Sequence, residues 1–137
     1  TITKWTEHPK VLVSKGDILI TVKGSGVGKV NILSEDASIG RQLMSIRGLA
    51  IHKSFCYYYL LSKVTLFQQL KVGIAIPGIG RDDILNQVIA LPPLDEQLRI
   101  IHKIDELMVL CDELENHIEN TVHYSDDLMK AIIKTAI

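Results

Sequence analysis

The stretch after Pro92-Pro93 constrains the fold most strongly, because it predicts one long amphipathic α-helix. Pro93 suits the first turn of a helix, where its missing N–H is not needed. Asp95 and Glu96 place negative charge near the positive end of the helix dipole. An apolar seam follows in alternating steps of four and three residues. Its apolar members are Ile100, Ile104, Leu107, Cys111, Leu114, Ile118, Leu128 and Ile132.

This predicted helix needs at least one other helix beside it. A second set of mainly apolar positions flanks the seam, so the apolar face covers about three positions in seven and is wider than a two-stranded seam. At 1.5 Å per residue, about 40 residues span roughly 60 Å. A domain of this size has a radius of gyration of about 14 Å. We therefore expect a helix that projects beyond the body of the domain and packs against another helix, as in a coiled coil.

The net charge of −1 conceals an asymmetry between the two parts of the chain. Residues 1–93 contain eleven Lys and Arg against six Asp and Glu, a net charge of +5. Residues 94–137 contain four against ten, a net charge of −6. A basic part can lie near phosphates, whereas an acidic helix is repelled by them. Nucleic-acid binding by the first part and an ordinary solvated surface both fit this pattern.

The residues before Pro92 predict a small β-rich domain with one helix. Residues 11–34 are expected to form a β-hairpin, because β-branched residues at alternate positions favour strands. Its strands are expected at 11–13, 18–22 and 29–33, with turns at 15–17 and 24–28; further strands are expected at 42–47 and 87–91. The spacing of aromatic and Leu residues predicts one helix over 52–71 that stops near Gly73. Residues 73–80 are expected to form a glycine-punctuated loop or a bent strand.

The segment Gly24-Ser25-Gly26-Val27-Gly28-Lys29 is similar to a phosphate-binding loop at first sight. The P-loop pattern needs Gly at the position of Lys23 and Ser or Thr at the position of Val30, and it opens a helix. The dinucleotide pattern GxGxxG fails as well, because Lys29 replaces its last Gly. A tight turn between two strands is the simplest interpretation. Such a turn also offers backbone N–H groups and lysine ammonium groups to a DNA phosphate.

No catalytic or metal-binding set is predicted, and no cofactor is expected. The five His lack ligand spacing. Asp82-Asp83 are interpreted as acids that cap a turn, and Tyr57-Tyr58-Tyr59 as packing residues rather than as a platform for bases. Cys56 and Cys111 are interpreted as two buried thiols of a cytosolic protein.

The totals place the chain in the α+β class. Its 137 residues are within the range of a single domain, and no apolar run reaches the roughly 18 residues needed to cross a bilayer. The start, Thr1-Ile2-Thr3, has neither an initiator Met nor the order of a signal peptide, so we expect part of a longer protein. We expect a small mixed or antiparallel β-rich domain in 1–92, followed by a spacer or dimerisation helix in 93–137.

The order of the pieces carries a family resemblance over about residues 10 to 115. These pieces are Gly16-Asp17-Ile18-Leu19-Ile20, then Gly28-Lys29-Val30, then Tyr59-Leu60-Leu61-Ser62, and finally the junction Ile89-Ala90-Leu91-Pro92-Pro93-Leu94-Asp95-Glu96-Gln97-Leu98-Arg99-Ile100-Ile101. The set resembles the specificity subunit of type I restriction–modification enzymes. In that family the PPLxEQxxI stretch marks the exit from a target recognition domain into a long connecting helix.

The resemblance implies a non-catalytic, cytoplasmic subunit that recognises double-stranded DNA. A complete specificity subunit carries two target recognition domains, each reading half of a bipartite site. Two long helices pair as an antiparallel coiled coil and space these domains. Methylation (modification) subunits and a restriction subunit are the partners that methylate and cleave. This chain has one partial recognition domain and one long helix, so a second copy could supply the other helix of a homodimer.

The candidate DNA contacts lie beside the glycine turns of the basic part, where Arg and Gln suit base edges and Lys suits phosphates. They are Lys23, Ser25, Lys29, Arg41, Gln42 and Arg81. Two other functions stay open on the sequence alone. The chain could be a helix-mediated assembly module without DNA binding of its own, or an enzyme that uses the Gly24–Lys29 loop on a nucleotide.

Overall fold

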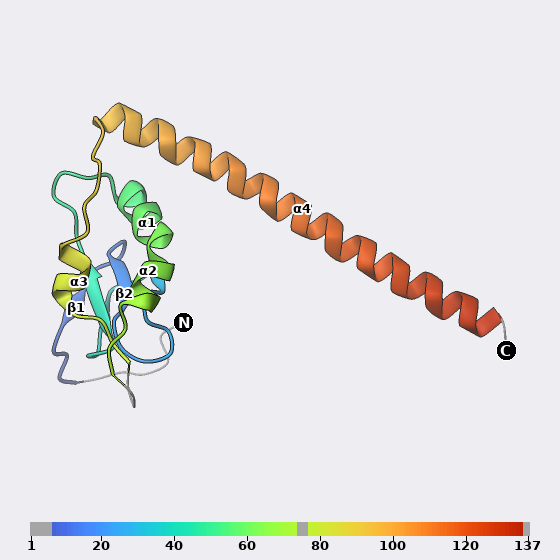
Figure 1. Cartoon of the computed structure of the whole chain (residues 1–137), viewed down its shortest axis with the longest axis horizontal. Coiled ribbons are helices and arrows are strands. Elements are labelled where there is room, and N and C mark those ends of the chain that lie inside the picture. Colours follow the sequence, from blue (N-terminus) through green and yellow to red (C-terminus); the bar gives the residue numbers. More distant parts are fainter. Residues whose placement is uncertain (1–6, 74–76, 136–137) are drawn as a thin grey trace. The chain divides into compact units, whose positions relative to one another are not determined.

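The computed structural model describes residues 7–73 and 77–135 and confirms the α+β class (Figure 1). The strands are β1 Leu12–Val13, β2 Ile18–Thr21, β3 Val30–Ile32, β4 Ala37–Ser38 and β5 Leu43–Ile46. The helices are α1 Lys53–Ser62, α2 Val64–Gln69, α3 Arg81–Leu85 and α4 Leu94–Thr135. The chain divides into two compact units, residues 1–98 and 99–137.

The central sheet of the first unit has the antiparallel order β3-β2-β5. Ile18 and Ile20 of β2 are buried, whereas Leu19 and Thr21 on the opposite face are partly exposed. This alternation is typical of a strand with one covered face. The predicted pairing of 18–22 with 29–33, and the predicted strand within 42–47, are confirmed.

The first segment of the predicted hairpin, residues 11–13, does not join this sheet, and that part of the prediction is wrong. Its strand β1 pairs with β4 instead, with Leu12 opposite Ser38 and Val13 opposite Ala37. Both edges of β2 are already occupied by β3 and β5, so β1 has no edge of β2 to bind. The turn predicted at 15–17 is present, with the N–H of Asp17 donating to the Ser14 carbonyl oxygen at 2.9 Å.

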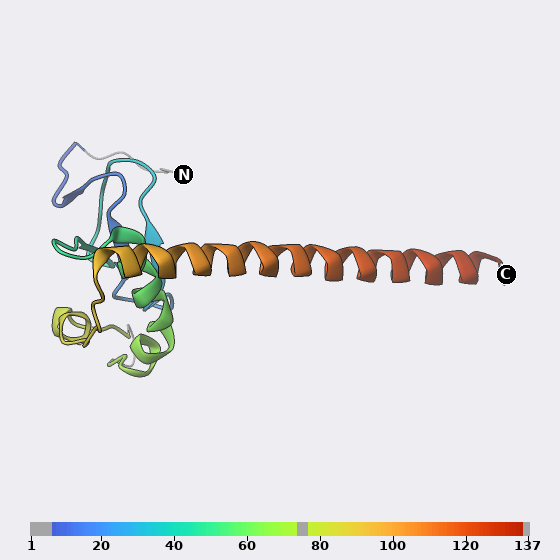
Figure 2. The ribbon, with the colours of Figure 1, turned by 90° about the horizontal axis from the view of Figure 1, so that it is seen from above.

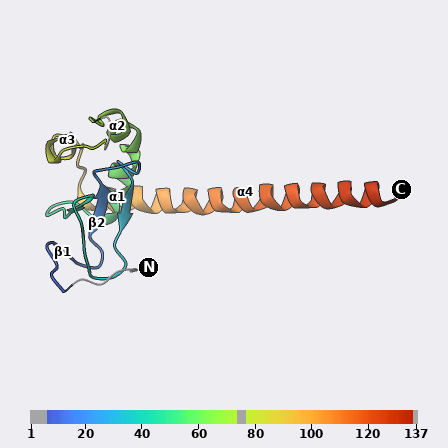
Figure 3. The same ribbon diagram turned by 90° about the horizontal axis from the view of Figure 1, so that it is seen from below.

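The core lies between helices α1 and α2 and the face of the sheet that carries Ile18 and Ile20 (Figures 1 and 3). Cys56 and Leu60 of α1 and the fully buried Phe67 of α2 belong to this core. The single helix predicted over 52–71 is wrong, because Lys63 interrupts it and the second helix ends at Gln69. The apolar spacing continues across the interruption, so the periodicity does not reveal it.

Residues 87–91 do not form the predicted strand. Residues 81–85 form the short helix α3, Asn86 continues it as a turn, and residues 87–91 have no strand partner among the described residues. The carbonyl oxygen of Val88 instead accepts a hydrogen bond from the Tyr59 hydroxyl at 2.8 Å, and the Val88 side chain is exposed. A side chain from α1 thus takes the place that a neighbouring strand would have had.

Asp83 supports the predicted role of an acid at a turn. Its Oδ2 atom accepts the Gly80 N–H at 2.7 Å at the start of α3. In the predicted loop 73–80, Gly78 forms isolated bridges with Lys23 and with Val72. Residues 74–76 of that loop lie outside the described residues.

Helix α4 is confirmed as one uninterrupted helix of 42 residues that begins directly after Pro93 (Figure 2). Most of its predicted seam, including Leu107, Leu114 and Ile118, is exposed in this chain. Cys111 is exposed as well, so the expectation of two buried thiols is correct for Cys56 and wrong for Cys111. Within 7–73 and 77–135, no helix combines the length and the apolar character needed to cross a membrane.

Candidate DNA interface

Three loops that are distant in the sequence meet at one end of β2. The Val22 N–H donates to the Gln42 carbonyl oxygen at 2.8 Å, and the Val22 carbonyl oxygen accepts the Ile79 N–H at 2.9 Å. The Gly24 N–H donates to the Pro77 carbonyl oxygen at 2.8 Å. These bonds join the glycine turn 24–28, the turn before β5 and the loop before α3. We call residues 23–29, 40–42 and 77–81 the loop cluster.

All six predicted DNA contacts belong to the loop cluster, and all six side chains are exposed. In the described part of the chain, no side-chain hydrogen bond or ion pair engages the four cations among them. Their charged groups are therefore available to an anion. These cations are Lys23, Lys29, Arg41 and Arg81.

The glycine turn in this cluster is built by backbone conformation, in agreement with its interpretation as a tight turn. Gly28 has φ +86°, a conformation that L side chains rarely adopt. A Cβ atom at Gly28 would lie 3.1 Å from both the Val64 carbonyl oxygen and the Phe67 Cβ. Strand β3 follows the turn, so the turn does not open a helix as a P-loop does. The turn is held against α2, and its outer side carries Ser25.

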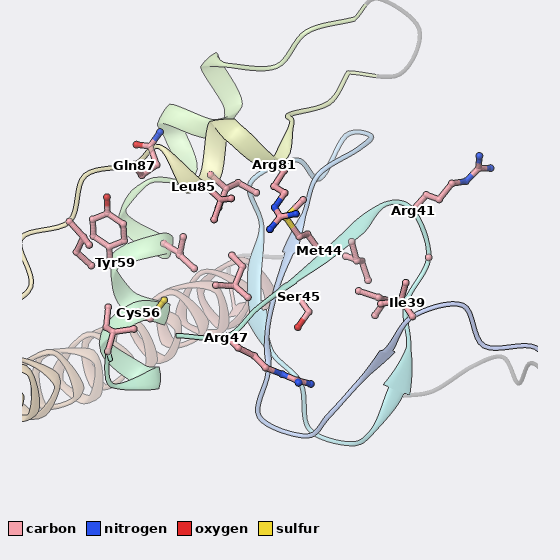
Figure 4. A pocket seen from close by; sticks show the side chains of 18 of the residues that line it. Ile39, Arg41, Met44, Ser45, Arg47, Cys56, Tyr59, Arg81, Leu85 and Gln87 are labelled. Atoms are coloured by element: carbon pink, nitrogen blue, oxygen red, sulfur yellow. The ribbon is translucent and has the colours of Figure 1, made fainter. Parts of the chain in front are cut away.

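A groove of about 1140 Å³ adjoins the loop cluster, and sequence reasoning did not predict it. Residues of β5, α1 and α3 line it, and its apolar lining includes Ile84. Met44 is another apolar lining residue (Figure 4). Its lining contains four cations and no Asp or Glu, and these cations are Lys10, Arg41, Arg47 and Arg81. In Figure 4, Arg81 lies above Met44, whereas Arg41 points away from the groove.

Arg47 differs from the other cations because a buried carboxylate binds it. Its Nε atom donates to Asp17 Oδ1 at 2.7 Å and its Nη2 atom to Asp17 Oδ2 at 2.6 Å. The hydrogen bond from Arg47 is the main reason that the pKa of Asp17 falls from 3.8 to about 2, against the opposing effect of burial. Since Ile18 pairs with Ile46 across the sheet, the antiparallel register places Asp17 and Arg47 opposite each other. Arg47 is therefore a structural cation.

Tyr57, Tyr59 and Cys56 serve packing, as predicted for these two tyrosines and this thiol. Tyr57 and Tyr59 pack against the core. Burial raises the pKa of the Cys56 thiol and is also the main cause of the raised pKa of Tyr59. Both groups stay uncharged at neutral pH, which suits the apolar lining of the groove.

Lys71 is a further exposed cation that sequence reasoning missed. It stands directly before Val72, which forms a bridge with Gly78 in the loop cluster. Its position beside the glycine-punctuated segment 73–80 was the available signal. Not every charge at this end is positive, since the exposed Asp82 follows Arg81 at the start of α3.

The junction motif around Pro92-Pro93 contains a buried polar side chain, Gln97, which is 2% exposed. Its Oε1 atom accepts the His52 N–H at 2.8 Å, and its Nε2 atom donates to the Pro92 carbonyl oxygen at 2.9 Å. His52 is the residue before α1. The first turn of α4 is therefore hydrogen-bonded to the start of α1 and to the proline segment, all within the first unit.

Comparison with known proteins finds relatives that are specificity subunits of type I restriction enzymes. The specificity subunit of the type I restriction enzyme EcoBI from Escherichia coli is 25% identical over 136 residues, 95% of this chain and 28% of that protein. The MjaX specificity subunit from Methanocaldococcus jannaschii is 32% identical over 120 residues, 84% of this chain and 28% of that protein. The chain thus spans little more than a quarter of the length of these relatives.

Solved structures agree with the sequence comparison. The crystal structure of the HsdS subunit from Thermoanaerobacter tengcongensis has a TM-score of 0.72 at 28% identity, over 82% of this chain and 27% of that one. A chain from a study of complex assembly and conformational transition of the type I R-M system has a TM-score of 0.73 at 30% identity, over 85% of this chain and 29% of that one. The sequence model of the type I restriction modification DNA specificity domain matches residues 6–124. The chain therefore belongs to the family of type I restriction–modification DNA specificity domains.

Proposed function

We propose that residues 1–92 recognise part of a bipartite DNA site for a type I restriction–modification system. The convergence of three exposed loops at one end of β2 carries this proposal, because it gathers all six candidate contacts in one place. Arg41, Gln42 and Arg81 offer groups that suit base edges, and Lys23 and Lys29 suit phosphates. Ser25 at the glycine turn adds a hydroxyl group for the DNA backbone.

The charge distribution supports this division of roles. Residues 1–93 carry a net charge of +5, which attracts the polyanion, whereas residues 94–137 carry −6. We assign residues 93–137 the role of the coiled-coil spacer. Its exposed seam would pair with a helix of a second copy or of a longer specificity polypeptide, and would leave the flanking apolar positions to a modification subunit.

In this proposal the chain is a non-catalytic subunit that acts in the cytoplasm, where the DNA is. Methylation and cleavage belong to the modification and restriction subunits that it would hold at the site. The exposed apolar residues of α4 offer these proteins a surface, since exposed apolar stripes of this extent are typical of interaction sites.

DNA binding can be tested by fluorescence anisotropy with a labelled random-sequence duplex, using the chain with and without a type I modification subunit. Affinity should fall steeply as salt rises from about 50 to about 200 mM, because binding releases counterions. Replacing Lys23→Glu and Lys29→Glu together should weaken binding at least about tenfold and lower the slope of log affinity against log salt by about 2.

The matched control is Lys15→Glu with Lys53→Glu, which changes the net charge equally. Both control residues are exposed, and Lys15 precedes β2 whereas the loop cluster follows it. Equal loss of binding in the two pairs would show a nonspecific charge effect and would remove the loop cluster from the proposal. Absence of DNA binding at low salt, with the modification subunit still bound, would favour the assembly-module alternative.

A further inference from the structure

Strand β5 is an edge strand whose outward backbone groups adjoin the groove. Since Val22 and Gln42 are hydrogen-bonded, the antiparallel register makes Ile20–Met44 and Ile18–Ile46 the bonded pairs as well. Ser45 lies at a non-bonded position opposite Leu19, so its N–H and C=O groups point away from β2. In the described ranges, β5 has no other strand neighbour.

The row of outward groups continues on both sides of Ser45. Like Ser45, Leu43 and Arg47 are at positions whose backbone groups point away from β2. The Leu43 N–H already donates to the Gly40 carbonyl oxygen at 3.1 Å. The outward N–H and C=O groups that remain occur at every second residue, so hydrogen-bond donors and acceptors alternate along this edge. Such a row matches the backbone of one further extended strand.

The side chains beside this edge indicate what kind of strand would fit. Met44 and Ile46 are only half-buried, although they lie on the core-facing side of the sheet. Across the groove lie Ile84, which is buried, and Leu85, which is 62% exposed. A strand with apolar residues at alternate positions would cover these surfaces. Of the cations that line the groove, Arg47 is already bound to Asp17 and Arg41 points away, so Lys10 and Arg81 remain. Because no Asp or Glu lines the groove, these two cations would favour carboxylates on that strand.

A DNA backbone would satisfy this edge poorly. Phosphate oxygens accept hydrogen bonds, so they could bind the outward N–H groups but not the outward carbonyl groups of Leu43 and Ser45. A helix would leave both kinds of group unpaired, because its own backbone bonds are internal. An extended peptide satisfies donors and acceptors together.

We propose that the edge of β5 is a strand-acceptor site for an extended, carboxylate-bearing segment of a longer specificity polypeptide. The chain spans 28% of its curated relatives, so those proteins contain additional chain that can supply such a segment. The proposal rests on membership of the family and does not depend on DNA binding by the loop cluster.

The test uses the full chain and overlapping synthetic peptides that copy the part of the MjaX specificity subunit outside the matched region. Fluorescence anisotropy should identify one extended peptide that binds. Hydrogen exchange followed by NMR should show the Ser45 amide exchanging fast in the chain alone and at least about tenfold slower with that peptide, because the amide acquires an acceptor. If no peptide binds, or if the bound peptide leaves Ser45 exchange unchanged, the proposal is wrong.

Ser45 also provides a matched pair of variants. Ser45→Pro removes the outward N–H, which an edge strand tolerates, and should weaken peptide binding about tenfold or more. Ser45→Ala loses the same hydroxyl but keeps the N–H, and should bind within about twofold of the original chain. Equal binding by both variants would overturn the proposal. A dimer that Ser45→Pro converts to a monomer would also overturn it, because a second copy would then occupy the edge.

Discussion

The Gln97 side chain accepts a hydrogen bond from the backbone N–H of His52 at 2.8 Å, and so joins the start of α4 to the start of α1. Its amide nitrogen donates to the Pro92 carbonyl oxygen. The PPLxEQ junction therefore contains a polar residue that is buried because both of its functional groups have partners. This gives a physical reason for Gln at a position where an apolar side chain would also fill the space.

Replacing Gln97→Ala should lower the free energy of unfolding of the first unit by about 1–3 kcal/mol, because the His52 N–H and the Pro92 carbonyl group lose their partner. Urea unfolding followed by near-UV circular dichroism of the tyrosines measures this change. Gln68→Ala, at an exposed position of α2, is the control and should be close to neutral. If the two variants unfold alike, the Gln97 hydrogen bonds do not stabilise the junction.

The Asp17–Arg47 pair should make stability depend on pH at the acid end. The pKa of Asp17 is about 2 in the folded chain and near 3.8 when unfolded, so the unfolded state binds the proton more readily. The stabilisation is complete above about pH 4 and is lost as pH falls toward 2. Since Arg47 is largely exposed, we expect on the order of 1–2 kcal/mol after solvent screening.

Urea titrations at a series of pH values compare Asp17→Asn with the original chain. Asp17→Asn should remove the contribution of this carboxylate between pH 4 and 2, and should lower stability at neutral pH. Glu35→Gln removes an exposed carboxylate outside this pair and serves as the control. If the free energy of unfolding of Asp17→Asn falls between pH 4 and 2 as much as that of the original chain, other carboxylates govern acid unfolding.

Replacing Gly28→Ala should lower the free energy of unfolding by about 1–3 kcal/mol, because it combines positive φ with a close contact to α2. The Gly40→Ala variant is the matched control, since a Cβ atom there meets nothing within 4 Å. Thermal unfolding of both variants provides the measurement. Equal midpoints for Gly28→Ala and Gly40→Ala would contradict the close packing of the turn on α2.

Self-association through α4 should be abolished by Leu107→Asp with Leu114→Asp, because the two carboxylates would be buried in the seam. Light scattering and sedimentation measure the oligomeric state. Val109→Asp with Asn116→Asp adds the same two charges at the same spacing on the face opposite the seam, and should leave association intact. An unchanged dimer in the Leu107/Leu114 variant would show that another surface mediates association.

The local patterns of the chain explain which predictions are confirmed. The start of α4 follows from Pro93 and the four-and-three spacing, and both are properties of neighbouring residues. The β2–β3 hairpin follows from alternation on both sides of a glycine turn. The interruption at Lys63 could not be predicted in this way, because apolar spacing describes the face of a helix and not the continuity of its backbone.

The sequence by itself determined the long helix, the turn at Gly24–Gly28 and the charge asymmetry, and it supplied the six residues that we propose as DNA contacts. Only the tertiary structure decided that β1 pairs with β4, that Val88 binds the Tyr59 hydroxyl instead of a strand, and that β5 has an open edge within the described residues. It also decided that the loops containing Lys23, Gln42 and Arg81 meet around Val22. These outcomes depend on which backbone edges are already occupied, and that is a property of distant pairings rather than of any local pattern.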